Sequence, residues 1–114
     1  MSIQIYWHKK NFDTQKAERF FKERRLPCQS LDLKKHKLGR REVEILLRGD
    51  ARKALDLEDV NVKSHPVAYT TNTETIIGYV LENPRFLISP LIRSGSAVII
   101  GYDEEKLLAL IGTS

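Results

Sequence analysis

The sequence is poor in cysteine, on which thiol chemistry and many metal sites depend: its 114 residues include one, Cys28. A single cysteine excludes an intramolecular disulfide and a metal centre made of several thiolates. The three histidines, His8, His36 and His65, are far apart and lack the short spacing of paired metal ligands. We therefore expect no metal site and no resident cofactor.

Long apolar runs are also missing. No stretch approaches the roughly 18–20 apolar residues that a membrane-spanning helix needs. The chain starts with a strand pattern and not with a charged segment followed by an apolar one, so we expect no secretory signal and a cytoplasmic location without membrane contact. Apolar residues make up 41% of the chain and charged residues 30%, which predicts a globular protein and argues against disorder.

The excess of positive charge is modest, at +4. Its densest run is Lys34-Lys35-His36-Lys37, whereas other basic residues stand beside glutamates. Such a run is usually a solvated face, and a site for a polyanion is the alternative. We do not expect nucleic acid as a direct ligand. Glycine-rich nucleotide motifs are absent from the sequence.

The first third of the chain predicts a strand, a helix and a second strand. Residues 3–7 alternate apolar with other side chains, as in a strand, and residues 14–25 carry apolar residues at helical spacing. Either Asn11 or Asp13 can cap that helix. Residues 28–33 predict the second strand, and a right-handed crossover would make the two strands parallel.

The middle of the chain predicts two clear helices, over 40–48 and 73–82. The segment between them is harder to interpret. Residues 51–57 favour a short helix, whereas His65-Pro66 and residues 70–72 are typical of loops.

The last thirty residues predict a hairpin with strands over 90–93 and 97–100, followed by a helix that Asp103 caps. The whole order is βαβ, then inserted helices, then ββα. It predicts an α/β protein of thioredoxin-like (glutaredoxin-like) fold with a mixed four-stranded sheet. We expect one domain over 1–114, with a helical insertion over about 39–83.

Two segments of the chain carry a recognisable set of residues. The first contains Ile5-Tyr6, Asn11, Asp13-Thr14, Lys16-Ala17 and Leu26-Pro27; the second contains Glu82-Asn83-Pro84, Leu87, Pro90-Leu91-Ile92 and residues 98–105. Both segments resemble the arsenate reductase (ArsC)/Spx family. Both occur in the family's order, although residues 50–73 align poorly. The resemblance implies a thioredoxin-like fold with a reactive thiolate at the N-terminus of the first helix. Helix amides and the helix dipole stabilise an anion there.

This chain departs from the family at the reactive positions. Counted without a gap, the family's cysteine falls at Asn11, and a shifted alignment places it at Phe12; neither side chain can form a sulfur intermediate. The position of a second cysteine in some members corresponds to Thr14. An oxyanion-binding arginine of the family corresponds to Ser89, directly before Pro90. The resemblance therefore implies a degenerate member without the catalytic cysteine, and it implies a cis bond before Pro90.

Two local interpretations stay open. Cys28 is either a structural thiol, as free cysteines usually are, or a relocated nucleophile. His8, Lys9 and Lys10 either form a solvated loop, with Asn11 serving only as a helix cap, or join Asn11 in holding a phosphate, sulfate or carboxylate.

The function that we expect is binding of a protein partner by a regulatory module without redox catalysis, and not an enzyme. This follows the resemblance, because Spx-like regulators bind RNA polymerase. One alternative is a binder of anions or small ligands at the N-terminus of the first helix. The other is a thiol-dependent, arsenate-type reductase that uses Cys28 and glutathione.

Overall fold

The structure is a computed structural model that describes residues 2–112. Its sheet has the strand order β2-β1-β3-β4. The first half of the sheet comes from a βαβ unit of β1 (Ile3–Trp7), α1 (Phe12–Glu23) and β2 (Gln29–Asp32). The strands β1 and β2 are parallel, as predicted.

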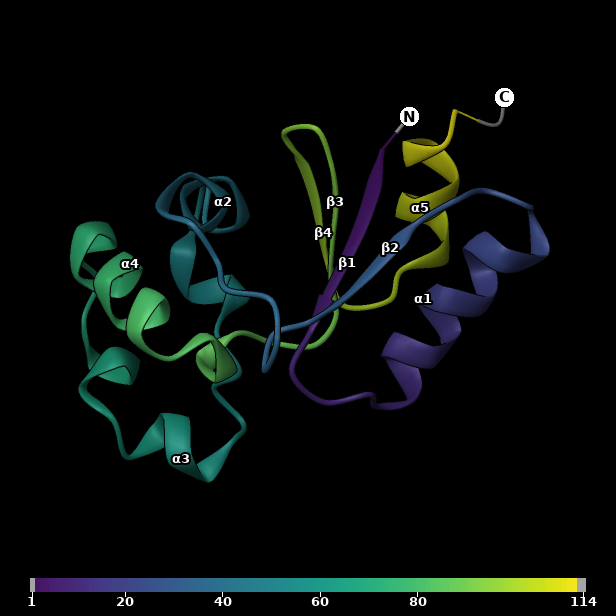
Figure 1. The fold of residues 1–114 in the computed structure, drawn as a ribbon. Coiled ribbons are helices and arrows are strands. Elements are labelled where there is room, and N and C mark those ends of the chain that lie inside the picture. Colours follow the sequence, from purple (N-terminus) through teal and green to yellow (C-terminus); the bar gives the residue numbers. More distant parts are fainter. Residues whose placement is uncertain (1, 113–114) are drawn as a thin grey trace.

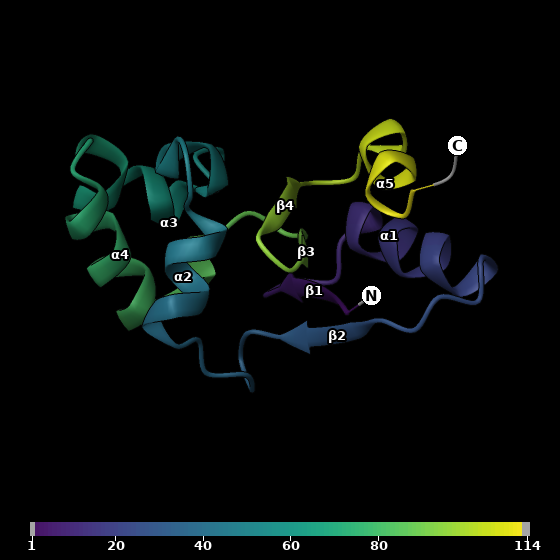
Figure 2. The same ribbon diagram turned by 90° about the horizontal axis from the view of Figure 1, so that it is seen from above.

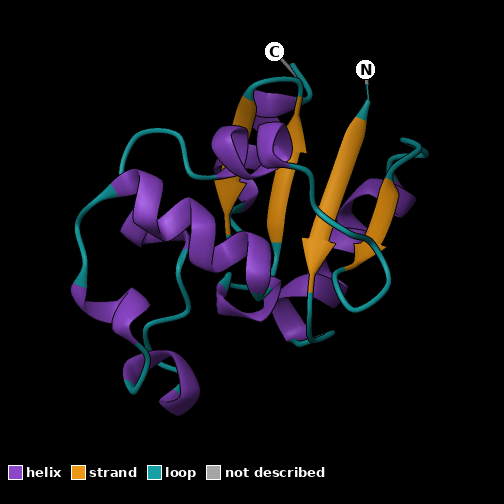
Figure 3. Ribbon diagram, turned by 60° about the vertical axis from the view of Figure 1, so that its left-hand side comes forward, coloured by secondary structure: helices purple, strands orange, loops and turns teal. Residues whose placement is uncertain are grey.

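The second half of the sheet is the predicted hairpin. It consists of β3 (Leu91–Ser94) and β4 (Ala97–Ile100), followed by α5 (Glu104–Leu110) with Asp103 as its N-cap. The hairpin is antiparallel, and β3 also pairs antiparallel with β1. Figure 3 shows the four strands side by side. The α/β class and the mixed four-stranded sheet are therefore confirmed.

Between β2 and β3 the chain is helical. Its elements are α2 (Arg40–Leu46), η1 (Ala51–Ala54), α3 (Val60–Lys63), η2 (Pro66–Tyr69), α4 (Thr73–Glu82) and η3 (Pro84–Phe86). The helix predicted over 73–82 has its predicted bounds.

The loop prediction at His65-Pro66 was wrong, because Pro66 begins the short 3₁₀ helix η2. His65 Nδ1 accepts a hydrogen bond from the Val67 amide at 3.0 Å, which caps the turn. Proline is favoured at a first helical position, because an amide hydrogen at that position would have no acceptor within the helix, so its absence costs nothing. The helix α3 was not predicted, and its buried Val62 gives too short an apolar pattern for a periodicity to appear.

Helices cover both faces of the sheet. Figures 1 and 2 show α1 and α5 on one side and α2, α3 and α4 on the other. Successive side chains of a strand point to opposite faces. Ile3 and Ile5 of β1 accordingly pack into the cluster with α1 and α5, whereas Tyr6 packs into the cluster with α2 and α4.

A polar network ties α2 to the sheet. The Tyr6 hydroxyl donates to Glu42 Oε2 at 3.0 Å, and His36 Nε2 lies 3.0 Å from the same oxygen. The Gly39 amide donates to Glu42 Oε1 at 3.0 Å. Burial acts to raise the pKa of Glu42, but the hydrogen bonds from Gly39, His36 and Tyr6 together lower it below its usual value. The carboxylate therefore stays ionised and anchors the start of α2.

No helix within the described residues is both long enough and apolar enough to span a bilayer.

Candidate functional site

The sheet topology brings the two sequence signatures together at one edge. The loop 8–11 follows the end of β1, and Pro90 directly precedes β3. Because β1 and β3 are antiparallel, with Tyr6 opposite Leu91, the loop and the proline lie at the same edge. The Ser89–Pro90 bond is cis, as expected from the resemblance.

Asn11 joins the helix to the proline segment. Its Oδ1 accepts from the Thr14 amide at 2.8 Å and from the Thr14 hydroxyl at 2.7 Å, so Asn11 is the N-cap of α1. Its Nδ2 donates to the Ser89 carbonyl oxygen at 2.8 Å. The helix thus starts at Phe12, two residues before the predicted start, and Asp13 belongs to its first turn. Both polar atoms of the Asn11 amide have partners inside the fold.

Ser89 completes this set of contacts. Its hydroxyl oxygen accepts from the His8 amide at 3.0 Å, and the residue is 3% exposed. Thr14 is fully buried. In the alignment without a gap, the positions at which the family's thiols and arginine are expected therefore hold three short polar residues that bond to one another and to the backbone. Their arrangement satisfies polar groups of one another and of the neighbouring backbone.

Phe12 has a different environment. It is the first residue of α1 and is 80% exposed, which makes it the most exposed of the large hydrophobic residues in the described chain. An aromatic ring that contributes little to the core and lies beside the cis-proline edge is available for contact with another molecule.

The two lysines of the loop do not converge on one point. Lys9 Nζ lies 3.2 Å from Asp56 Oδ2, and Lys10 Nζ lies 3.3 Å from Glu18 Oε2. Asp56 is buried and precedes α3, whereas Glu18 belongs to α1. Each cation is thus matched by a carboxylate. The four residues proposed as an anion site, His8, Lys9, Lys10 and Asn11, are close in sequence, but the two charges are directed to different partners.

The surroundings of His8 favour the uncharged form of its imidazole. Burial lowers the pKa of its imidazole, and the nearby Lys9 charge lowers it further. Its Nε2 is buried and has no hydrogen-bond partner among residues 2–112. A neutral ring adds no charge to an anion site.

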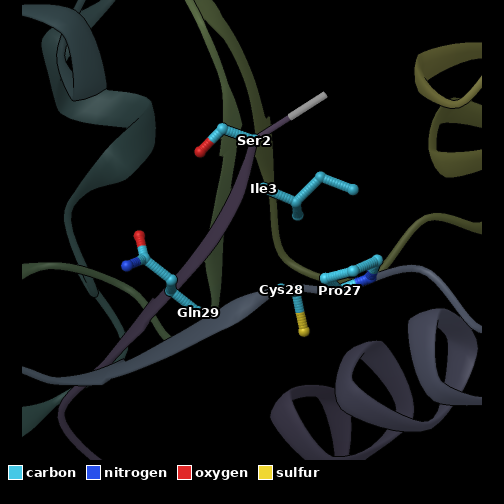
Figure 4. Close-up of a pocket in the computed structure, with 5 residues that line it drawn as sticks. All are labelled: Ser2, Ile3, Pro27, Cys28 and Gln29. Carbon is cyan, nitrogen blue, oxygen red and sulfur yellow. The ribbon is translucent and has the colours of Figure 1, made fainter.

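Cys28 lies at the opposite edge of the sheet. It directly precedes β2, and Gln29 pairs with Gln4 near the start of β1, whereas Asn11 follows the end of β1. A five-residue strand separates these edges by roughly 15 Å. Figure 4 shows the thiol beside Pro27, on the side of α1. Burial raises the pKa of the Cys28 thiol, and the Glu18 charge raises it further.

Sequence reasoning missed two residues that organise this region. Asp56 forms an ion pair with Lys9. Arg52 donates hydrogen bonds from its guanidinium to the carbonyl oxygens of Thr70 and Ala68, at 2.8 and 2.7 Å. Both lie in the segment whose pattern was hardest to interpret, and neither has a sequence signal. Residues 2–112 contain no group of three or more His, Cys, Asp and Glu side chains placed to hold a metal ion.

Comparisons by sequence give no relatives: no protein-family model and no curated protein matches the chain. Comparison with solved structures gives clear matches. An arsenate reductase from Vibrio cholerae superposes with a TM-score of 0.81 at 14% identity, over 96% of this chain and 97% of that one. An ArsC family related protein from Bacteroides fragilis gives 0.80 at 16%, covering 96% and 99%. An ArsC related protein from Brucella melitensis gives 0.70 at 17%, covering 99% and 97%.

Each alignment covers nearly the whole length of this chain and nearly the whole length of the matched structure. Identities this low establish the fold and leave the activity open. This chain has the thioredoxin-like fold of ArsC-type proteins.

Proposed function

We propose that this protein is a degenerate ArsC/Spx-like module that binds a protein partner and does not carry out thiol redox catalysis. The observation that carries the proposal is the closed N-terminus of α1. Asn11, which the alignment without a gap places at the position of the reactive thiol, uses its side-chain amide to bond Thr14 and the Ser89 carbonyl. A thiolate mechanism needs sulfur at that position.

The remaining thiol supports the same conclusion. Cys28 lies at the other edge of the sheet, and burial and Glu18 raise its pKa. The thiolate is the reactive form, so a raised pKa leaves less of it at neutral pH.

Phe12 supports binding of a protein. A ring that is 80% exposed gains little from folding, but it would be covered on contact with a partner. It stands next to the cis-proline edge at which proteins of this fold receive their substrates, as the resemblance implies. RNA polymerase, the partner of the Spx-like regulators, is the first protein to test.

A glutathione-coupled arsenate reductase assay tests the absence of redox catalysis. We expect no turnover by the wild type and slow reaction of the native thiol with a disulfide reagent at pH 7. Turnover by the wild type that disappears in Cys28→Ser would overturn this part of the proposal.

Photo-crosslinking tests the binding role. Benzoylphenylalanine is placed at Phe12 in one variant and at Tyr69 in a control, because Tyr69 is 78% exposed and lies in η2, remote in sequence. We expect an adduct with one defined protein, RNA polymerase being tried first in purified form, from position 12 and none from position 69. Equal adducts from both positions, or none, would contradict the proposal.

A further inference from the structure

A groove separates the turn after β2 from the end of α4. It consists of two adjoining pockets of about 410 and 280 Å³ that share Leu33, Lys34 and Pro84. One wall is the turn 33–38, and the other is the segment 81–85. His8 lines the far end of the first pocket, so the groove reaches the loop that precedes α1.

Positive charge is concentrated along this groove. Lys34, Lys35 and Lys37 line it from one wall and Arg85 from the other, against one carboxylate, Glu82. The four cations are exposed, and none of them forms an ion pair with another described residue. The lysines of the neighbouring loop 8–11, in contrast, are both paired. The groove thus accounts for most of the net charge of the chain, which is +4.

The turn that carries the lysines is held in place. The Asp32 carbonyl oxygen accepts from the amides of Lys35 and His36 at 2.9 and 2.7 Å, and the Asp32 carboxylate accepts from the Lys34 amide at 2.9 Å. His36 turns inward to Glu42 and stacks obliquely against Tyr6, with ring centroids 6.0 Å apart. The lysines are therefore presented from a fixed backbone, which lowers the entropy cost of binding.

Opposing charges at the groove are smaller. Glu82 and the Asp32 carboxylate at the Lys34 amide each carry one negative charge, and the C-terminus of α4 contributes the equivalent of roughly half a charge. Glu42 is already engaged by His36, Tyr6 and Gly39. Four cations exceed this sum, so the groove attracts an anionic ligand.

The apolar residues that line the groove, which form its floor, indicate which kind of anionic ligand fits. Leu33, Leu38, Leu81 and Pro84 supply aliphatic surface, and no phenylalanine, tyrosine or tryptophan of the described residues lines either pocket. Single-stranded nucleic acid gains much of its affinity by stacking bases on aromatic rings. The rings that line these pockets are the imidazoles of His8, whose Nε2 is buried, and of His36, which is held by Glu42 and Tyr6. Aliphatic side chains of a peptide can pack on the floor while neighbouring carboxylates meet the lysines.

We propose that this groove binds an acidic peptide segment with interspersed aliphatic residues, supplied by the protein partner. The inference rests on the proposed function and adds a recognition surface to it: Phe12 contacts the partner at the cis-proline edge, and the groove receives its acidic segment.

A fluorescence anisotropy titration tests the inference with a labelled twelve-residue peptide of glutamate and leucine. The comparison probes are the same peptide with glutamine for glutamate and a single-stranded oligonucleotide of equal charge. The groove variant is Lys34→Glu/Lys35→Glu/Lys37→Glu. Its control, Lys22→Glu/Lys53→Glu/Lys106→Glu, changes the net charge equally at exposed lysines that line neither pocket. Unfolding curves verify that both variants fold.

We expect the acidic peptide to bind the wild type, more weakly as salt rises. The groove variant should bind at least about tenfold more weakly, and the control variant within about twofold of wild type. Absence of binding, equal loss in both variants, equal binding of the glutamine peptide or tighter binding of the oligonucleotide each overturns the inference. Photo-crosslinking from position 12 separates this inference from the proposed function. If the groove variant gives the same yield of adduct with the partner as the wild type does, the groove is refuted and the proposed function stands.

Discussion

Two neighbouring regions of this protein differ in whether their polar and charged side chains have partners within the fold. At the N-terminus of α1, Asn11, Thr14 and Ser89 bond to one another and to the backbone, and Lys9 and Lys10 each have a carboxylate. In the groove between 33–38 and 81–85, the cations have no such partner among the described residues. The contacts of the first region stabilise the fold, and the second region is the surface that we propose as a binding site. The sequence resemblance pointed to the first region, but the unpaired charge lies in the second.

The largest effect that separates the two roles is expected from Asn11→Ala. It removes the cap of α1 and the bond to the Ser89 carbonyl, and should lower the free energy of unfolding by about 2–3 kcal/mol. Asn72→Ala is the matched control, because the Asn72 side chain caps α4 through the same two bonds from Thr75 and makes no third side-chain hydrogen bond within the described residues. It should cost about 1 kcal/mol. Urea unfolding measures both, and equal losses would show that the link to Ser89 contributes nothing.

A smaller effect is expected from the two loop lysines. Lys9→Met leaves Asp56, whose side chain is 10% exposed, without its partner, and should cost about 1–2 kcal/mol. Lys10→Met breaks a pair with Glu18 that is more exposed to water, and should cost less than about 0.5 kcal/mol. Thermal or urea unfolding at low salt compares them. If Lys10→Met is the more damaging change, the loop is not closed through Asp56 as described.

An effect smaller than those of Asn11→Ala and Lys9→Met concerns Glu42, which anchors the lysine turn through His36. Folding lowers the pKa of Glu42, so its contribution to stability is present above the pKa of the unfolded chain and is lost as the pH falls through the folded pKa. Glu42→Gln should therefore cost about 0.5–1 kcal/mol at pH 7 and progressively less in acid. Unfolding curves of both proteins between neutral pH and pH 3 measure the difference. A difference that grows in acid would contradict the assigned sign.

Much of the fold was predictable because its signals are local. The alternation over 3–7, the helical spacing over 73–82 and the Asp103 cap each depend on a few neighbouring residues, and the structure has these elements where the sequence predicted them. The segment 50–73 was not predictable in the same way. Its short helices are held by distant contacts, such as the Arg52 guanidinium on the Thr70 and Ala68 carbonyls.

For the candidate site, the resemblance implied reactive positions but no contacts. It placed the family's cysteine at Asn11, or at Phe12 in the shifted alignment, and the family's arginine at Ser89. Whether Asn11 and Ser89 formed an open pocket or bonded to each other depended on the antiparallel pairing of β1 with β3, which joins residues 78 positions apart. Tyr6 was likewise predicted only as one residue of an alternating strand, and its bond to Glu42 depends on how α2 packs on the sheet.

By itself, the sequence determined what this protein lacks and which elements it forms. One cysteine, no paired metal ligands and a βαβ–helices–ββα pattern follow from residue types and their spacing, since these act over a few residues. Only the tertiary structure decided that the N-terminus of α1 is closed, that Cys28 lies at the far edge of the sheet and that the lysines of 34–37 remain unpaired. Each of these depends on which side chains meet across the sheet and between α4 and the turn after β2. These contacts join residues far apart in the chain, so sequence spacing does not determine them.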